Sequence, residues 1–165
     1  MIRVEEPNDG NELAVTVGWL RFHRDALAAK CARLSPGDLT SAPCSPSKLS
    51  LLGLVRHLTE MERVYGVWAL GPKTDLDMVY GQYTDDGPEW EFDVDESMVA
   101  ESFERWEREQ RATDGRVASF ESFDTPGPAT GRSVRWSLQK LVGEYARHNG
   151  HADLIRERLD GTTGE

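Results

Sequence analysis

The stretch SVRWSLQKLVGEYARHNGHADLIRERLDG, residues 133–161, predicts one long amphipathic helix. Apolar residues recur along it every three or four positions, which places them on one face of a helix. They are Val134, Leu138, Leu141, Tyr145, Ala152, Ile155 and Leu159. Gly161 suits the position just after the last helical residue, where a left-handed backbone is common. Such a helix needs partners to cover its apolar face.

Three other segments of the chain show the same periodicity. They run from about Asn11 to Leu34, from Leu51 to Leu70 and from Asp95 to Ala118. Ser35-Pro36-Gly37 should stop the first of them, because proline cannot continue a helix. The alternating pattern of strands is weak throughout. We therefore expect an all-α fold, a four-helix bundle with a long crossover connection between Gly71 and Val94.

Composition limits the classes of partner. The 165 residues fit a single domain spanning 1–165, and the formal net charge of −10 repels phosphate backbones and anionic lipids. No apolar run is long enough to span a bilayer, and the N-terminal residues MIRVEEPNDG do not resemble a signal peptide. Cys31 and Cys44 are expected to be free thiols. We expect a cytoplasmic protein that binds small molecules and neither nucleic acid nor membranes. A homodimer is compatible with such a bundle, although no specific signal points to it.

Three side chains could meet inside this bundle and hold a metal. Glu144 and His148 are four residues apart on the last predicted helix, so their side chains share a face. His57 lies beside Leu54 and Leu58 in the apolar stripe of the second predicted helix and should point inward. Two imidazoles and one carboxylate suit a divalent cation, Zn²⁺ first, with Ni²⁺, Fe²⁺ or Mn²⁺ as alternatives. Three protein ligands would leave a coordination position for water or substrate.

Each half of this pattern also has a plainer interpretation. A single histidine on an apolar helix face is more often a packed or hydrogen-bonded core residue than a ligand. A glutamate and a histidine four residues apart most often form a solvated helix face. Two helices that aim donors at one core favour metal binding more than either half does alone, but the residue pattern leaves both interpretations open.

Two runs that contain these residues resemble a known family. Residues 49–58, LSLLGLVRHL, and 144–157, EYARHNGHADLIRE, are similar to the DinB/YfiT-like metalloenzyme superfamily. More narrowly, they resemble its actinobacterial mini-circle branch, near the mycothiol-dependent maleylpyruvate isomerases. The similarity covers the first, second and last predicted helices, and is loose over residues 71–131. The resemblance implies a DinB-type four-helix bundle whose metal is held by His57, Glu144 and His148.

The resemblance also implies an activity class. Characterised relatives are thiol transferases or thiol-dependent isomerases in which a low-molecular-weight thiol binds the metal. A metal-bound thiol is deprotonated and becomes a nucleophile at neutral pH. The expected function is therefore metal-dependent transfer of a thiol such as mycothiol to a small electrophile. The alternatives are a metal-dependent hydrolase and a non-catalytic binding or dimerisation module with a structural or vestigial metal site.

Glu60 and His151 are the candidates for catalytic groups beside the metal. Glu60, three residues after His57, is either a general base or a group behind the ligands, or it is a solvated charge, as is usual for glutamate. His151 extends the helix face of Glu144 and His148. Many relatives have glutamine at its position, so the resemblance implies a second-layer residue or part of the pocket wall.

Overall fold

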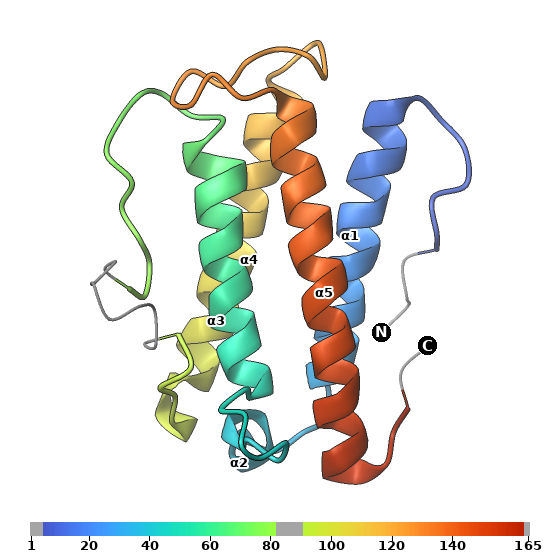
Figure 1. Ribbon diagram of the computed structural model, residues 1–165, viewed down its shortest axis with the longest axis vertical. Helices are drawn as coiled ribbons and strands as arrows, with labels where there is room; N and C mark the ends of the chain where they lie inside the picture. Colours follow the sequence, from blue (N-terminus) through green and yellow to red (C-terminus); the bar gives the residue numbers. More distant parts are fainter. Residues whose placement is uncertain (1–4, 82–90, 164–165) are drawn as a thin grey trace.

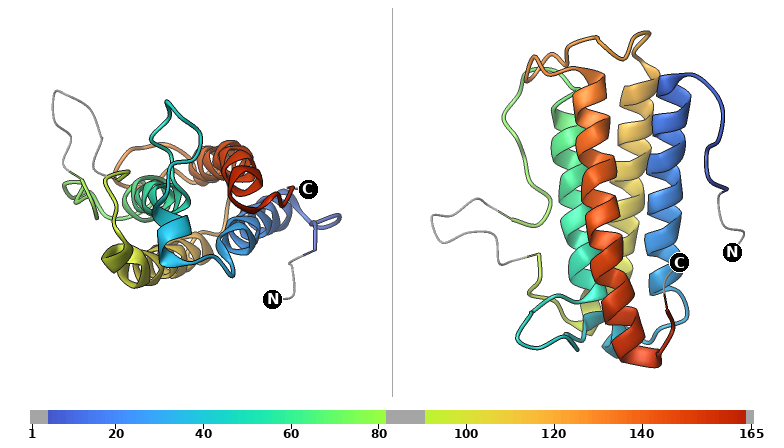
Figure 2. Two further views of the ribbon diagram at one scale, coloured as in Figure 1. Left: turned by 90° about the horizontal axis from the view of Figure 1, so that it is seen from below. Right: turned by 45° about the vertical axis from the view of Figure 1, so that its right-hand side comes forward.

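The structure confirms the predicted all-α fold class, because four long helices lie side by side around the core (Figures 1 and 2). The computed structural model describes residues 5–81 and 91–163. The long elements are α1 (Glu12–Cys31), α3 (Leu51–Met61) with its π-helical continuation η1 (Glu62–Trp68), α4 (Val99–Ala118) and α5 (Val134–Asp160). Two short elements, α2 (Pro36–Thr40) and the 3₁₀ turn η2 (Glu96–Met98), complete the described helices. α1 packs along α5, and α4 packs along α3 and η1. Among the described residues, no helix is long and apolar enough to cross a membrane.

Side-chain caps start the helices close to where the sequence predicts a start. Asn11, Ser50 and Ser133 each accept a hydrogen bond from the backbone N–H three residues later. These caps satisfy N–H groups that have no partner within the first helical turn. At the other end of α5, Gly161 has a φ of 76°, the left-handed conformation expected there. Asp95 caps η2 rather than α4. The helix predicted to begin at Asp95 therefore begins at Val99, a few residues later.

The short helix α2 was not predicted, and it corrects the interpretation of Ser35-Pro36-Gly37 as a simple stop. α1 has already ended at Cys31, and these residues begin a new helix. The Ser35 hydroxyl accepts from the Asp38 N–H, while the Asp38 carboxylate accepts from the Ser35 N–H. Proline fits the first helical turn because an N–H there has no helical acceptor. Proline thus starts a helix here instead of only ending one.

The second predicted helix is not uniform, as expected from Leu51 to Leu70, but changes to a π-helix at Glu62. In η1 the Ala69 N–H donates to the Val64 carbonyl, five residues earlier. At the same point the Thr113 hydroxyl of α4 donates to the Glu62 carbonyl. Gly66 permits this close approach, since a Cβ there would lie 2.0 Å from Thr113 Oγ1. Packing against α4 therefore accompanies the change in helix type.

The core runs through the middle of the bundle and is built largely from leucine. Its fully buried apolar side chains are Leu27, Leu51, Leu52, Leu54, Val55, Leu58, Leu138, Leu141, Tyr145 and Ala152. All of these residues except Leu52 and Val55 belong to the predicted apolar stripes, which confirms the helical periodicity as the source of the fold. α3 contributes more of them than any other described element, so its side chains, polar ones included, are held in defined positions.

Candidate metal centre

The predicted ligands His57, Glu144 and His148 come together between α3 and α5. One donor atom of each lies within 4.8 Å of the donor atoms of the other two. Glu144 Oε2 is 3.9 Å from His57 Nε2 and 3.5 Å from His148 Nε2. The two imidazole rings meet edge to face, with centroids 4.5 Å apart. Within residues 5–81 and 91–163, no other three histidine, cysteine or acidic residues converge in this way.

The apolar stripes explain why these donors face each other. Leu54 and Leu58, on either side of His57 along α3, are fully buried and fix that face of the helix against the core. On α5 the fully buried Tyr145 does the same for Glu144 and His148, which lie one turn apart at i and i+4. The residues that build the core therefore also aim the three donors at a common point.

The geometry and the polar atoms of this site fit a divalent cation. The buried His57 Nε2 atom has no hydrogen-bond partner among the described residues, which is costly unless a ligand fills that role. Donors bonded at about 2.1 Å to one tetrahedral ion lie about 3.4 Å apart, close to the observed separations. The three side chains are 12–19% exposed, so the site is open to solvent on one side. Three donors and an open side suit a metal that also binds a small molecule.

Glu91, at the end of the crossover connection, holds the His57 ring from behind. Its carboxylate lies 2.7 Å from His57 Nδ1 and its side chain is 7% exposed. Phe92 stacks against the same imidazole, with an interplanar angle of 22°. A carboxylate on the distal nitrogen of a ligand histidine is the usual arrangement in metal sites, because it fixes the ring and its tautomer. No sequence pattern points to Glu91, since it lies in a non-helical connection 34 residues after His57.

His148 has a comparable partner in His151. Their Nδ1 atoms are 3.2 Å apart, so one ring donates and the other accepts. With a metal on Nε2, a neutral His148 would carry its proton on Nδ1 and donate it to His151. Burial, followed by the neighbouring His57, His151 and Arg147, lowers the pKa of His148 to about 4. His148 is therefore neutral at pH 7, the form that binds metals.

A family model described as mycothiol-S-transferase matches residues 15–161. The chain belongs to the mycothiol S-transferase family. This membership confirms the resemblance to the DinB/YfiT-like superfamily, and the matched region contains all three candidate ligands. A mycothiol transferase family implies small-molecule substrates. No curated protein and no solved structure matches the chain significantly.

In this member of the mycothiol S-transferase family, Glu60 is not a solvated charge, although that is the usual environment of a glutamate and the interpretation that the sequence favours. Its side chain is fully buried, and its carboxylate accepts hydrogen bonds from the backbone N–H groups of Val79 and Tyr80. Burial raises the pKa of Glu60, the N–H donors oppose that shift, and the nearby Glu91 charge adds to it. The error arose because a connection, rather than solvent, covers that face of α3. Glu60 thus links α3 to residues 79–80 of the crossover.

Both cysteines are free thiols, as predicted, and neither belongs to the group of donors. Cys31 is buried in the core, and burial raises the pKa of its thiol to about 12. A thiol of this kind stays protonated and is a poor nucleophile at neutral pH. Cys31 is therefore not placed to act as a nucleophile.

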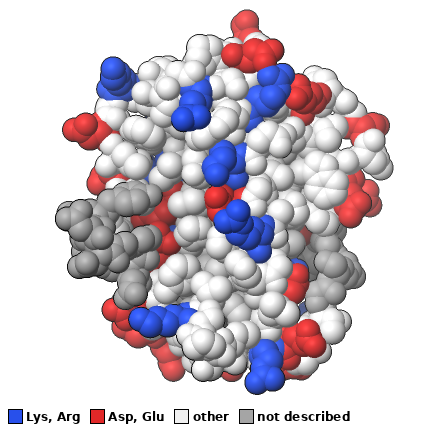
Figure 3. All heavy atoms as spheres, viewed as in Figure 1, with Lys and Arg blue, Asp and Glu red and all other residues white. Residues whose placement is uncertain are grey.

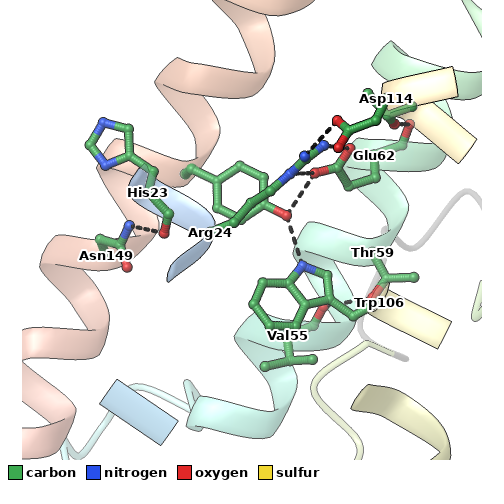
Figure 4. Close-up of polar contacts among 10 residues, drawn as sticks. His23, Arg24, Val55, Thr59, Glu62, Trp106, Asp114 and Asn149 are labelled. Carbon is green, nitrogen blue, oxygen red and sulfur yellow. Dashed lines mark hydrogen bonds and ion pairs between the residues drawn. The ribbon is translucent and has the colours of Figure 1, made fainter. Parts of the chain in front are cut away.

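A second polar cluster, the core network, lies deeper in the bundle (Figure 4). Arg24 of α1 forms two hydrogen bonds with Glu62, at 2.7 and 2.8 Å, and a third with Asp114. The Tyr145 hydroxyl donates to Glu62 and accepts from Trp106 Nε1, at 2.8 and 2.7 Å. The network thereby joins α1, η1, α4 and α5. The sequence does not reveal this network, because helical periodicity describes apolar side chains and not buried polar ones.

The face that carries α3 and α5 is more basic than the overall composition suggests. Figure 3 shows lysine and arginine side chains along the middle of this face, over α5, although the net charge of the chain is −10. On α5, the Nζ atom of Lys140 is 3.7 Å from Glu144 Oε1. Positive side chains near a site raise the local concentration of anions. The positive side chains on this face would therefore attract anionic small molecules toward the donors.

Proposed function

We propose that this protein is a metal-dependent thiol S-transferase that joins mycothiol, or a similar low-molecular-weight thiol, to a small electrophile. The observation that supports it is the convergence of His57, Glu144 and His148 in a chain of the mycothiol S-transferase family. Zn²⁺ is the first choice for two imidazoles and one carboxylate, and Ni²⁺, Fe²⁺ and Mn²⁺ are alternatives.

The roles of the residues follow from their contacts. His57 and His148 would bind through Nε2, with Glu91 and His151 holding the opposite ring nitrogens. Glu144 would supply the negative charge that balances the cation. A bound divalent cation lowers the pKa of a thiol and so supplies a thiolate at neutral pH. The open side of the site admits the co-substrate, whose sulfur would attack the electrophile and displace its leaving group.

The two predicted catalytic groups receive different roles. His151 would orient His148 and accept a proton at the edge of the site, since its ring is only partly buried. Glu60 already accepts backbone hydrogen bonds from two N–H groups, so we propose that it anchors the crossover rather than acts as a general base. In this proposal neither group binds the metal directly.

Metal analysis tests the proposal first. The purified protein should contain or take up one divalent cation per chain, and His57→Ala and His148→Ala should abolish this. His23→Ala is the matched control, because His23 lies on α1, outside the group of donors. Metal that survives both ligand substitutions would contradict the proposed site.

Activity is tested with an aryl chloride electrophile in the presence and absence of thiol. Mycothiol and the metal should both be required, with chloride released as the new carbon–sulfur bond forms. Turnover that needs the metal but no thiol would favour a hydrolase instead. Stoichiometric metal binding without turnover of any electrophile would favour a binding module.

A further inference from the structure

We infer that Glu91 is a positioning residue that keeps the proton of His57 on Nδ1 and so presents the Nε2 lone pair to a cation. This inference rests on the proposed metal site. Glu91 is buried and belongs to a connection rather than to either helix that carries the ligands. The readiness of the site to bind metal would therefore depend on a third segment of the chain.

The first step concerns the proton between the two side chains. A carboxylate can only accept hydrogen bonds, so at the observed 2.7 Å the proton must lie on Nδ1 of His57. In the opposite tautomer the Nδ1 lone pair would face the carboxylate, which is repulsive. That tautomer would also leave the Nε2–H 3.9 Å from Glu144, too far for a hydrogen bond. Glu91 thus favours the one neutral form of His57 that can bind a metal through Nε2.

The second step concerns the ring orientation. Phe92 follows Glu91 directly and stacks on the His57 ring at a centroid distance of 6.1 Å. This approach requires glycine at position 53, one turn before His57, because a Cβ there would lie 2.5 Å from Phe92 Cδ1. Glu91 and Phe92 therefore restrain both the proton and the plane of the imidazole, at a place where α3 has no side chain in the way.

The third step concerns an earlier part of the same connection. Glu60 receives the N–H groups of Val79 and Tyr80, and the Arg56 guanidinium lies 4.2 Å from the centroid of the Tyr80 ring. α3 thus contacts the connection at two separate places, residues 79–80 through Glu60 and Glu91 through His57.

The test uses metal-free protein, so that its first readout does not depend on metal binding. Long-range ¹H–¹⁵N NMR distinguishes the two neutral tautomers, and four histidines make assignment practicable. The wild type should carry the His57 proton on Nδ1, and Glu91→Ala should shift it toward Nε2, which free imidazole side chains prefer. Glu91→Gln keeps an acceptor oxygen and should keep the wild-type tautomer. Asp93→Asn removes a charge from an exposed residue nearby and should change nothing.

The second readout is Zn²⁺ affinity, measured by competition with a chromophoric chelator. Glu91→Ala should weaken binding 10- to 100-fold, Glu91→Gln by a smaller factor, and Asp93→Asn by less than twofold. An unchanged tautomer and affinity in Glu91→Ala would overturn the inference. If Glu91→Ala does not fold, an unchanged affinity in Glu91→Gln overturns it. A wild type with the expected tautomer but no metal affinity would refute the proposed function and leave the positioning role intact.

Discussion

The core network and the metal centre both place glutamate among nitrogen donors inside the same bundle, yet they are built in opposite ways. In the core network each polar side-chain atom of Arg24, Glu62 and Tyr145 has a partner at 2.7–2.8 Å. At the metal centre the donors stand 3.5–4.8 Å apart, and His57 Nε2 has no partner among the described residues. A cluster whose polar atoms all have hydrogen-bond partners within the protein stabilises the fold. A cluster whose donor atoms lack such partners is arranged to bind a ligand.

The largest expected effect comes from breaking the core network. Glu62→Ala leaves the buried Arg24 with Asp114 as its one carboxylate partner among the described residues, and should lower the free energy of unfolding by about 3–5 kcal/mol. Urea unfolding of metal-free protein measures this loss. Glu104→Ala is the control, since Glu104 forms an exposed ion pair with Arg108 and should change stability by less than about 0.5 kcal/mol. A small effect of Glu62→Ala would show that the network contributes little net stability.

The next effect concerns the stability that a bound cation adds to the wild type. At a Zn²⁺ concentration of 100 times its Kd, the free energy of unfolding should rise by about 2.7 kcal/mol. His148→Ala should gain none of this at the same concentration, because Nε2 is lost as a donor. Thermal unfolding with and without Zn²⁺ measures the difference. Equal gains in the two proteins would place the cation elsewhere.

Two neighbouring residues of α5 separate the two clusters most sharply. Tyr145→Phe removes the acceptor of Trp106 Nε1 and should cost about 1–3 kcal/mol of stability, while metal affinity stays within twofold. Glu144→Gln should do the reverse: at least tenfold weaker metal binding, with metal-free stability nearly unchanged. Measuring unfolding and chelator competition on both variants completes the comparison. If either substitution changes both quantities strongly, the two clusters are coupled.

The smallest effect concerns His23, which belongs to neither cluster. Burial, followed by the charge of Lys30, lowers the pKa of its imidazole below 6.5. Below pH 6.5 the unfolded chain therefore binds more protons than the folded one, and stability falls as the pH falls. His23→Gln should remove this slope and lose less stability between pH 7.5 and pH 5. The expected difference is below about 1 kcal/mol, because the ring is only half-buried and solvent screens it. Parallel urea titrations of both proteins at the two pH values measure this difference. A larger loss of stability in His23→Gln than in the wild type would contradict the prediction.

The sequence allowed the bundle and the positions of the three donors to be predicted, because both follow from helical periodicity. His57, Glu144 and His148 lie on the flanks of apolar stripes, so burying the stripes brings the three together. Glu91 could not be found in this way, since no period relates a residue in a connection to a helix 34 positions earlier.

The misjudged charges have a different cause. Glu60 was compared with typical surface glutamates and Glu62 was given no role, but both are buried against elements that sequence periodicity does not relate to them. Glu60 meets the backbone of the crossover, and Glu62 meets an arginine on α1 and a tyrosine on α5. The π-helix that begins at Glu62 also has no signature in the apolar pattern.

α3 is covered almost all the way around, by the bundle core on one side and by the crossover on the other. Between Leu51 and Glu60, His57 is half-buried and every other residue is buried. A dissolved reagent that reaches this stretch of the helix must therefore touch the imidazole first. Chemical modification or paramagnetic quenching of residues 51–60 should accordingly be confined to the His57 ring. A small molecule that reaches this part of α3 would meet that ring first.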